Sequence, residues 1–280
     1  MIIKTPQEIK QIVKGGQIIG KILSDLVKLC RHGISTWEID QIAEEMIIKA
    51  GGEPSFKGYT RGRDSIPFPS TICAPRNFEL VHAIAKKNVF LQEGDIFSID
   101  IGMEYPCKIP NPKSQIPNPN CDGYFTDTSI TIAIGEIPEK TRELMRVTKE
   151  ALEVGIRAAK PENTVADIGR TIEDYVNSQG KYGIVRDLVG HGVGHEVHEE
   201  PRIPNFYDKK LESWVLRPGM VIAIEPMISL GDYRVKTAAD GWTIEMADGS
   251  LCAHYEHTVV IMKNGNEVVT RRPGERSENY

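Results

Sequence analysis

Two similar pairs of helices, about 130 residues apart, constrain the fold of this chain more than any other feature. In each pair the second helix opens with a capping box, formed by Ser35 with Glu38 in the first pair and by Thr164 with Asp167 in the second. A glycine follows the end of each of these helices. A chance coincidence of two capping boxes is one explanation, and duplication of a unit of two helices and strands is the other. Duplication predicts two pseudo-symmetric halves.

The remaining elements follow from the spacing of apolar and β-branched residues. Thr5 and Pro6 open the first helix, whose apolar residues recur at helical spacing. After Pro138 another helix extends to about Ala159. Short β-branched runs that are typical of strands cover residues 95–101, 124–134, 221–227 and 255–262. We therefore expect an α+β fold with a central antiparallel sheet.

The charge of the chain limits its partners. The 280 residues carry a net charge of -5, with a pI of about 5.9. A chain of this charge lacks the basic field that attracts nucleic acids or anionic membranes. It also has no apolar run of about 18 residues and no apolar signal-peptide core at its N-terminus. We expect neither a nucleic-acid partner nor a membrane partner.

The cysteine pattern bears on the compartment. The five cysteines are scattered and include no CxxC pair. Neither a disulfide framework nor a zinc knuckle is indicated by this pattern. A reducing environment fits best, so we expect a cytoplasmic protein.

Two segments are expected to lie outside the core. Residues 103–122 contain five prolines, which is incompatible with a central strand and indicates a surface loop inserted between two strands. Residues 271–280 form a polar tail that we expect to be frayed. Residues 1–270 are expected to form one domain, and neither outer segment is expected to carry chemistry.

Four carboxylates and one imidazole lie in or beside apolar segments, where ionisable groups are unusual. A buried carboxylate needs a proton, a positive partner or a metal ion, and the four strand segments contain no Lys or Arg. For a single residue, a solvated strand end or a salt bridge is the ordinary explanation. Five together favour two divalent ions held by oxygen ligands and one imidazole. These residues are Asp100, Asp127, His191, Glu225 and Glu256.

The segments around these residues resemble those of the type I methionine aminopeptidases, which have the pita-bread fold. The motifs are GDIFSIDIG, GHGVGHEVHEEP, GMVIAIEPM and DGWTIEMADGSLCAHYEHTVVI. The resemblance extends from residue 4 to about residue 269 and implies an α+β pita-bread catalytic domain. It also implies hydrolysis that removes the N-terminal methionine of nascent polypeptides when the second residue is small. We expect a monomer, and the ribosome is a candidate transient partner.

The resemblance also assigns roles to the five residues. Asp100 would chelate one metal ion, and His191 and Glu225 would bind the other. Asp127 and Glu256 would bridge the two ions, which are Co, Mn, Fe(II) or Zn. A hydroxide between the metals would attack the first peptide bond, with Glu225 handling protons.

Two further histidines and an apolar pocket are implied by the same resemblance. His82 and His198 would contact the substrate amide and stabilise the tetrahedral intermediate, although each could otherwise be an ordinary strand-end or loop histidine. His195 is expected to be only a packed or hydrogen-bonded loop residue. The methionine pocket would be lined by Phe56, Tyr59, Cys73 and Trp242, each of which could equally belong to the core.

This chain departs from the family pattern at two positions near these histidines. Ala83 follows His82 where the family has glycine, so the loop around His82 is expected to differ, because glycine permits backbone angles that alanine resists. Val197 stands before His198 where an aromatic residue is expected, which predicts a roomier methionine pocket.

Three alternative functions share the same scaffold. An Xaa-Pro aminopeptidase would have the same ligands, but such chains normally carry a large N-terminal domain, and only about 90 residues precede the first ligand strand here. A metal-free binding module would be expected to lose ligands, whereas all five are present. A creatinase-like hydrolase lacks motif support.

Overall fold

The computed structural model describes residues 2–60, 66–107 and 122–275. Its described part contains four α-helices, which are α1 (Pro6–Val27), α2 (Thr36–Lys49), α3 (Glu139–Ala158) and α4 (Val165–Gln179). The capping boxes predicted at Ser35 and Thr164 are both present. Thr5 caps α1 as predicted, and it also forms a capping box with Glu8. The paired helices of the sequence analysis are therefore confirmed.

The strands form one nine-stranded sheet and two small three-stranded sheets in the described residues, and every pairing is antiparallel. The main path of the large sheet has the order β1-β4-β5-β14-β9-β7-β8, with β2 on β4 and β15 on β14. Its strands are β1 (Glu53–Pro54), β2 (Ile72–Cys73), β4 (Ile96–Tyr105), β5 (Tyr124–Ala133), β7 (Gly190–Gly192), β8 (Glu199–Ile203), β9 (Val221–Ile224), β14 (Glu256–Ile261) and β15 (Asn266–Val268). The small sheets are β13-β10-β6 and β11-β12-β3, made of β3 (Glu79–Val81), β6 (Gly183–Ile184), β10 (Met227–Ser229), β11 (Val235–Thr237), β12 (Ile244–Met246) and β13 (Cys252–His254). A short 3-10 turn covers Lys209–Leu211.

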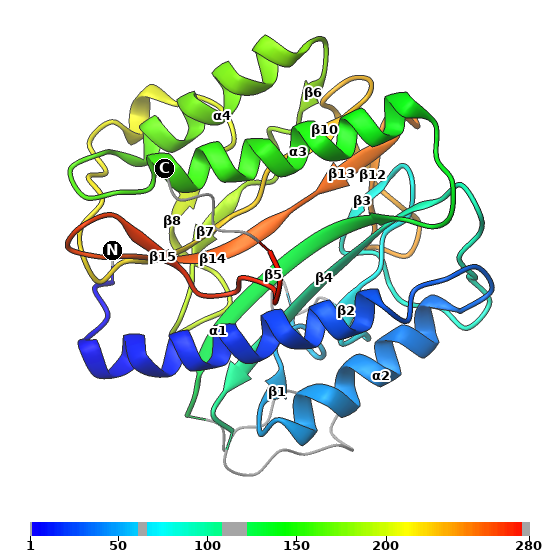
Figure 1. Ribbon diagram of the computed structural model, residues 1–280, viewed down its shortest axis with the longest axis horizontal. Helices are drawn as coiled ribbons and strands as arrows, with labels where there is room; N and C mark the ends of the chain where they lie inside the picture. The colour runs from blue at the N-terminus through cyan, green and yellow to red at the C-terminus, as the bar shows by residue number, and fades with distance from the viewer. Residues whose placement is uncertain (1, 61–65, 108–121, 276–280) are drawn as a thin grey trace.

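The two helix pairs cover the two halves of the large sheet. Figure 1 shows α1 and α2 beside β4 and β5, and α3 and α4 beside the strands of the second half. In the centre β5 pairs with β14, so the strands of the two halves are neighbours there. This is the arrangement of two halves around an antiparallel sheet that the sequence predicts, and the pita-bread fold is confirmed.

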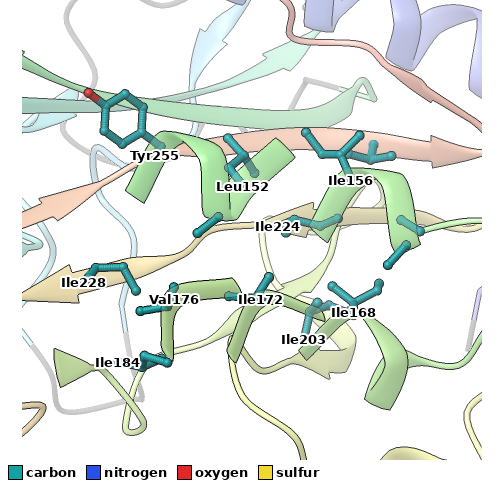
Figure 2. Close-up of a cluster of buried hydrophobic side chains, with 14 of the residues drawn as sticks. Leu152, Ile156, Ile168, Ile172, Val176, Ile184, Ile203, Ile224, Ile228 and Tyr255 are labelled. Atoms are coloured by element: carbon teal, nitrogen blue, oxygen red, sulfur yellow. The ribbon is translucent and has the colours of Figure 1, made fainter. Parts of the chain in front are cut away.

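Each half has its own apolar core beneath its helices. In the second half, side chains of α3 and α4 pack on the strands, as Figure 2 shows for Leu152, Ile172 and Ile224. Ile224 is fully buried and directly precedes Glu225. In the first half, Phe97, Ile99 and Ile101 of β4 belong to the core under α1 and α2. These contacts fix the strands from their helix-covered face.

Alternation along the strands presents the polar residues on the opposite face. On β4, Asp100 lies between Ile99 and Ile101, which point into the helix-side core, so its own side chain points away from the helices. Glu225 follows Ile224 in the same way at the end of β9. The carboxylates of both halves therefore converge on the face that the helices do not cover.

The sequence-based prediction for strand 221–227 needs a correction. The structure has two strands here, because β9 ends at Ile224 and β10 begins at Met227. Glu225 and Pro226 lie between them. Proline has no N–H for a ladder bond, and the break leaves Glu225 at a strand end facing the cavity.

The expectations about the loop, the cysteines and the tail are also corrected. Strand β4 continues to Tyr105, so the loop does not begin at residue 103. Residues 108–121 of the predicted loop lie outside the described residues. Cys107 is disulfide-bonded, although no disulfide was expected, whereas Cys30, Cys73 and Cys252 are free. The start of the tail is packed, since Arg272 is buried and pairs with Glu275 at 2.6 Å; residues 276–280 lie outside the described part.

Candidate metal centre and substrate cavity

A cavity of about 470 Å³ lies on the sheet face opposite the helices. All five predicted metal ligands line this cavity, together with other residues from both halves of the chain. The cavity brings together all eleven residues that were assigned to the site from the sequence. The lining residues among them are Phe56, Tyr59, Cys73, His82, Asp100, Asp127, His191, His198, Glu225, Trp242 and Glu256.

Strand pairing places the ionisable residues next to one another. On neighbouring strands β4 and β5, Asp100 pairs with Ser129, and Ser129 in turn pairs with Glu256 of β14. His191 Nε2 lies 3.4 Å from Asp127 Oδ2 and 3.7 Å from Glu225 Oε1. Ligand atoms of Asp127, His191 and Glu256 all lie within 4.8 Å of one another. Residues separated by more than a hundred positions in sequence thus form one cluster.

Burial strongly disfavours the charged forms of the four carboxyl groups. Burial raises the pKa of Asp100 to about 7 and that of Glu225 to about 8. It also raises the pKa of Asp127, and that of Glu256 goes well above its usual range. Among the described residues, no Lys or Arg forms an ion pair with any of these carboxylates. Four acids in one buried cluster therefore lack a cationic side chain to balance them.

This cluster fits divalent metal ions. Asp100 Oδ1 is buried and has no hydrogen-bond partner in the described structure. His191 Nδ1 lies 2.9 Å from the carbonyl oxygen of Gly192, an arrangement in which Nδ1 carries the proton and donates it. Nε2 of His191 then presents a lone pair toward Asp127 and Glu225, as a metal-ligating imidazole must. Carboxylate oxygens with one imidazole suit ions such as Mn, Fe, Co or Zn.

His198 and His82 stand at the cavity wall on different elements. The ring of His198 lies 4.5 Å from that of His191, and its Nδ1 lies 3.1 Å from the Tyr59 hydroxyl. The ring of His82 contacts that of Trp242 at 6.5 Å. Both histidines therefore face the space in front of the carboxylates.

The backbone at His82 bears on the expectation that Ala83, in place of glycine, changes this loop. The left-handed conformation belongs to His82 itself, with a φ of 56°, and not to Ala83. Ala83 is buried, and its carbonyl oxygen accepts a hydrogen bond from Ala74 N at 2.9 Å. A glycine is not required after His82 in this loop, while the conformation at His82 is of the strained kind that clusters at functional sites.

One side of the cavity is apolar and aromatic. Trp242 packs edge-on against Phe68 at 5.2 Å, and its indole N–H donates to the carbonyl oxygen of Ile66 at 3.0 Å. Cys73 belongs to the same cluster, with Phe56 and Tyr59 packed against it. Phe68 and Met227 also line the cavity and were not identified from the sequence. Their aromatic and thioether chemistry was the available signal.

The expectation that Val197 makes this pocket roomier stays a prediction. Val197 is buried, but it is absent from the described residues that line the cavity. His195 behaves as expected, because its Nε2 lies 2.6 Å from Glu8 outside the cavity.

Residues 10–109 and 118–263 match metallopeptidase family M24. The chain belongs to this family. Of its relatives, the methionine aminopeptidase of Clostridium acetobutylicum is 42% identical over 270 residues, which are 96% of this chain and 98% of that protein. The crystal structure of methionine aminopeptidase from Thermotoga maritima has a TM-score of 0.86 and 38% identity, and covers 97% of this chain and 100% of that one.

More distant M24-like structures share the scaffold. The prolidase from Pyrococcus horikoshii has a TM-score of 0.70 and 25% identity, and the match covers 97% of this chain but 64% of the prolidase. The unmatched part of the prolidase agrees with the expectation that proline-specific relatives are longer. In the M24 chain described here, no helix of the described residues is long and apolar enough to cross a membrane.

The site of this M24 chain contains one buried histidine that the sequence analysis missed. His254 Nε2 lies 3.4 Å from Glu225 Oε2, and its side chain is 2% exposed. It stands two residues before Glu256, on the same face of the chain. That spacing was a signal in the sequence.

Proposed function

We propose that this M24 metallopeptidase removes the N-terminal methionine of nascent polypeptides, with two divalent metal ions at the acidic end of its cavity. The observation that carries the proposal is the junction of two surfaces in one cavity. A buried cluster of four carboxylates and one imidazole adjoins an aromatic, sulfur-containing side of the same cavity. Relatives named methionine aminopeptidase match nearly the whole chain.

The ligand roles that we propose are those that the family resemblance implies. We assign Asp100 to one ion, His191 and Glu225 to the other, and Asp127 and Glu256 to both. The lone pair of His191 and the unpartnered Oδ1 of Asp100 support these assignments. When bound, the ions would polarise the scissile carbonyl and lower the pKa of water.

The protein groups around that centre would handle protons and orient the substrate. Glu225 lies at the end of β9 and lines the cavity, and we assign it the transfer of a proton to the leaving amine. His198 is oriented by the Tyr59 hydroxyl, and His82 is held by its left-handed backbone, so both can present a fixed N–H to the substrate amide.

The aromatic side of the cavity would receive the methionine side chain. Trp242 and Phe68 form a perpendicular pair, and Cys73 stands between them and the acidic cluster. A thioether favours contacts with aromatic edges. Phe56 and Tyr59 would complete the pocket.

The proposal extends to the biological setting. We infer a single catalytic domain over residues 1–270, active as a monomer in the cytoplasm, that meets emerging chains near the ribosome. A small second residue would be preferred because the peptide must place its first amide bond beside the carboxylates.

The test is metal-dependent release of methionine. The purified chain is stripped of metal, reconstituted with Mn²⁺, Co²⁺, Fe²⁺ or Zn²⁺, and incubated with Met-Ala-Ser, Met-Pro or Ala-Pro. We expect free methionine from Met-Ala-Ser, two ions per chain by elemental analysis, and losses of about 10²- to 10⁴-fold in kcat/KM for Glu225→Gln and His191→Ala. The exposed positions Glu267→Gln and His32→Ala are matched controls. Cleavage of Ala-Pro without cleavage of Met-Ala-Ser would favour the Xaa-Pro aminopeptidase, and failure to bind metal would leave a binding module.

A further inference from the structure

His254 lies directly behind the acidic cluster. Its neighbours Ala253 and Tyr255 point into the core under α3, so alternation turns His254 toward the face that bears Glu256. His254 does not line the cavity in the described structure, and its side chain is buried. It therefore stands beneath the carboxylates and away from the substrate.

The backbone of His254 is held by Thr131 of β5, the strand that also carries Asp127. The Thr131 hydroxyl accepts a hydrogen bond from His254 N and donates one to His254 O, both at 2.9 Å. The same hydroxyl is within 2.8 Å of Ser98 Oγ on β4, the strand of Asp100. Hydrogen bonds that link β4, β5 and β13 thus fix the backbone from which the His254 ring extends.

Neither ring nitrogen of His254 has a hydrogen-bond partner in the described structure. This contrasts with His191 and His257, whose Nδ1 atoms lie 2.9 Å from Gly192 O and Thr270 Oγ1. A buried N–H without an acceptor destabilises the folded protein. The acceptor that faces the His254 ring is Glu225 Oε2, at 3.4 Å from Nε2.

The two oxygens of Glu225 are divided between two imidazoles. Oε2 faces His254, whereas Oε1 faces His191 at 3.7 Å. Because His191 donates from Nδ1, its Nε2 is an acceptor and offers no hydrogen bond to Glu225. His254 is the neighbouring imidazole that can donate to this carboxylate. The separation of 3.4 Å slightly exceeds an ordinary N–H···O hydrogen bond.

We propose that His254 is a positioning residue that donates its Nε2–H to Glu225 Oε2 and thereby keeps Oε1 beside His191 for the metal ion. An imidazole always has at least one ring N–H, so His254 has a proton to donate. Hydrogen bonds behind a ligating carboxylate orient it and strengthen its hold on the metal. The inference rests on the proposed function, because it gives Glu225 a metal to hold.

The test compares two substitutions that differ in hydrogen bonding. His254→Gln keeps a side-chain N–H donor, whereas His254→Leu removes it at similar volume. The exposed position His32→Leu is the matched control for the same chemical change. Each protein is stripped of metal and titrated with Mn²⁺ by calorimetry, and its metal-free thermal unfolding and its kcat and KM for Met-Ala-Ser are measured.

We expect His254→Leu to bind Mn²⁺ about 10- to 100-fold more weakly, with metal-free unfolding at or above the temperature of the unsubstituted chain. We expect His254→Gln to stay within about threefold of that chain, by analogy with replacement of one buried donor by another. At saturating Mn²⁺, kcat of His254→Leu should fall while KM is retained.

Unchanged Mn²⁺ affinity in His254→Leu would overturn the inference and leave the proposed function standing. An equal loss in His254→Gln and His254→Leu would also overturn it, since the nitrogen would then act as a direct ligand. Absence of Mn²⁺ binding by the unsubstituted chain would overturn the proposed function itself, and the inference with it.

Discussion

Lys4 and Glu199 form a buried ion pair that ties the N-terminal segment to the loop that carries His198. The other oxygen of Glu199 accepts hydrogen bonds from the backbone N–H groups of His195 and Glu196, at 2.6 and 3.2 Å. One carboxylate therefore closes the loop and anchors it. The residue beside His198 is fixed by a lysine almost two hundred positions away in sequence.

Replacement of Lys4 by methionine should loosen this loop. The change leaves the Glu199 carboxylate buried and unpaired, and removal of one partner of a buried pair costs about 3–5 kcal/mol. We expect urea unfolding to show a loss of this order and kcat to fall because His198 is less well held. Lys10→Met, at an exposed position of α1, is the control. Equal stability of the two variants would contradict the role of the ion pair.

Gly102→Ala should disturb the methionine pocket without touching a ligand. A Cβ at Gly102 would lie 2.2 Å from Ser55 Oγ and 2.8 Å from the Phe56 ring, so Phe56 must move. Overpacking of this kind costs about 1–3 kcal/mol. We expect KM for Met-Ala-Ser to rise more than kcat falls. Gly265→Ala is the control, because a Cβ there meets no atom within 4 Å. Its positive φ means that alanine should lower stability, and KM should stay unchanged.

The stability of the metal-free protein should fall as pH rises. Burial raises the pKa of Asp100 from 3.8 to about 7 and that of Glu225 from 4.5 to about 8, so the folded state binds more protons than the unfolded state between about pH 4 and pH 8. The stability from these groups is present at low pH and is lost as pH rises through the folded pKa values. Denaturant unfolding at pH 5 and pH 8 should differ by about 3 kcal/mol for each of the two groups.

Two comparisons test whether the buried carboxyl groups cause this dependence of stability on pH. Glu225→Gln cannot ionise at this position, and it should flatten the dependence on pH. Excess Mn²⁺ should stabilise the protein more at pH 8 than at pH 5, because ligands must lose protons to bind metal. A metal-free protein that gains stability from pH 5 to pH 8 would contradict the assignment of these buried acids.

The features that the sequence predicted are those with a local signal. The capping boxes at Ser35 and Thr164 depend on residues three positions apart, and the alternation around Asp100 is visible within one strand. Four acids and one imidazole in apolar segments therefore indicated the site from the sequence alone, without knowledge of the strand pairing. The spatial arrangement of the halves came from the repeat and the family resemblance.

The features that were missed depend on contacts between distant segments. Nothing in the sequence around Lys4 indicates that it meets Glu199, almost two hundred positions away. His254 differs, because its spacing of two residues from Glu256 places both side chains on the same side of an extended chain. It was overlooked because a lone histidine in a strand is ordinarily a core or surface residue.

The first part of the tail offers the last prediction, since it is packed and not frayed. Arg272 is buried, donates to Ser129 O at 3.3 Å and pairs with Glu275, whose carboxylate also lies 3.4 Å from His257 Nε2. Arg272→Met would leave Glu275 without its cation next to the strand of Glu256. We expect a loss of about 3 kcal/mol in urea unfolding and weaker Mn²⁺ binding, whereas Lys263→Met in an exposed turn should change neither. Wild-type stability in Arg272→Met would show that residues after 270 contribute nothing to the fold.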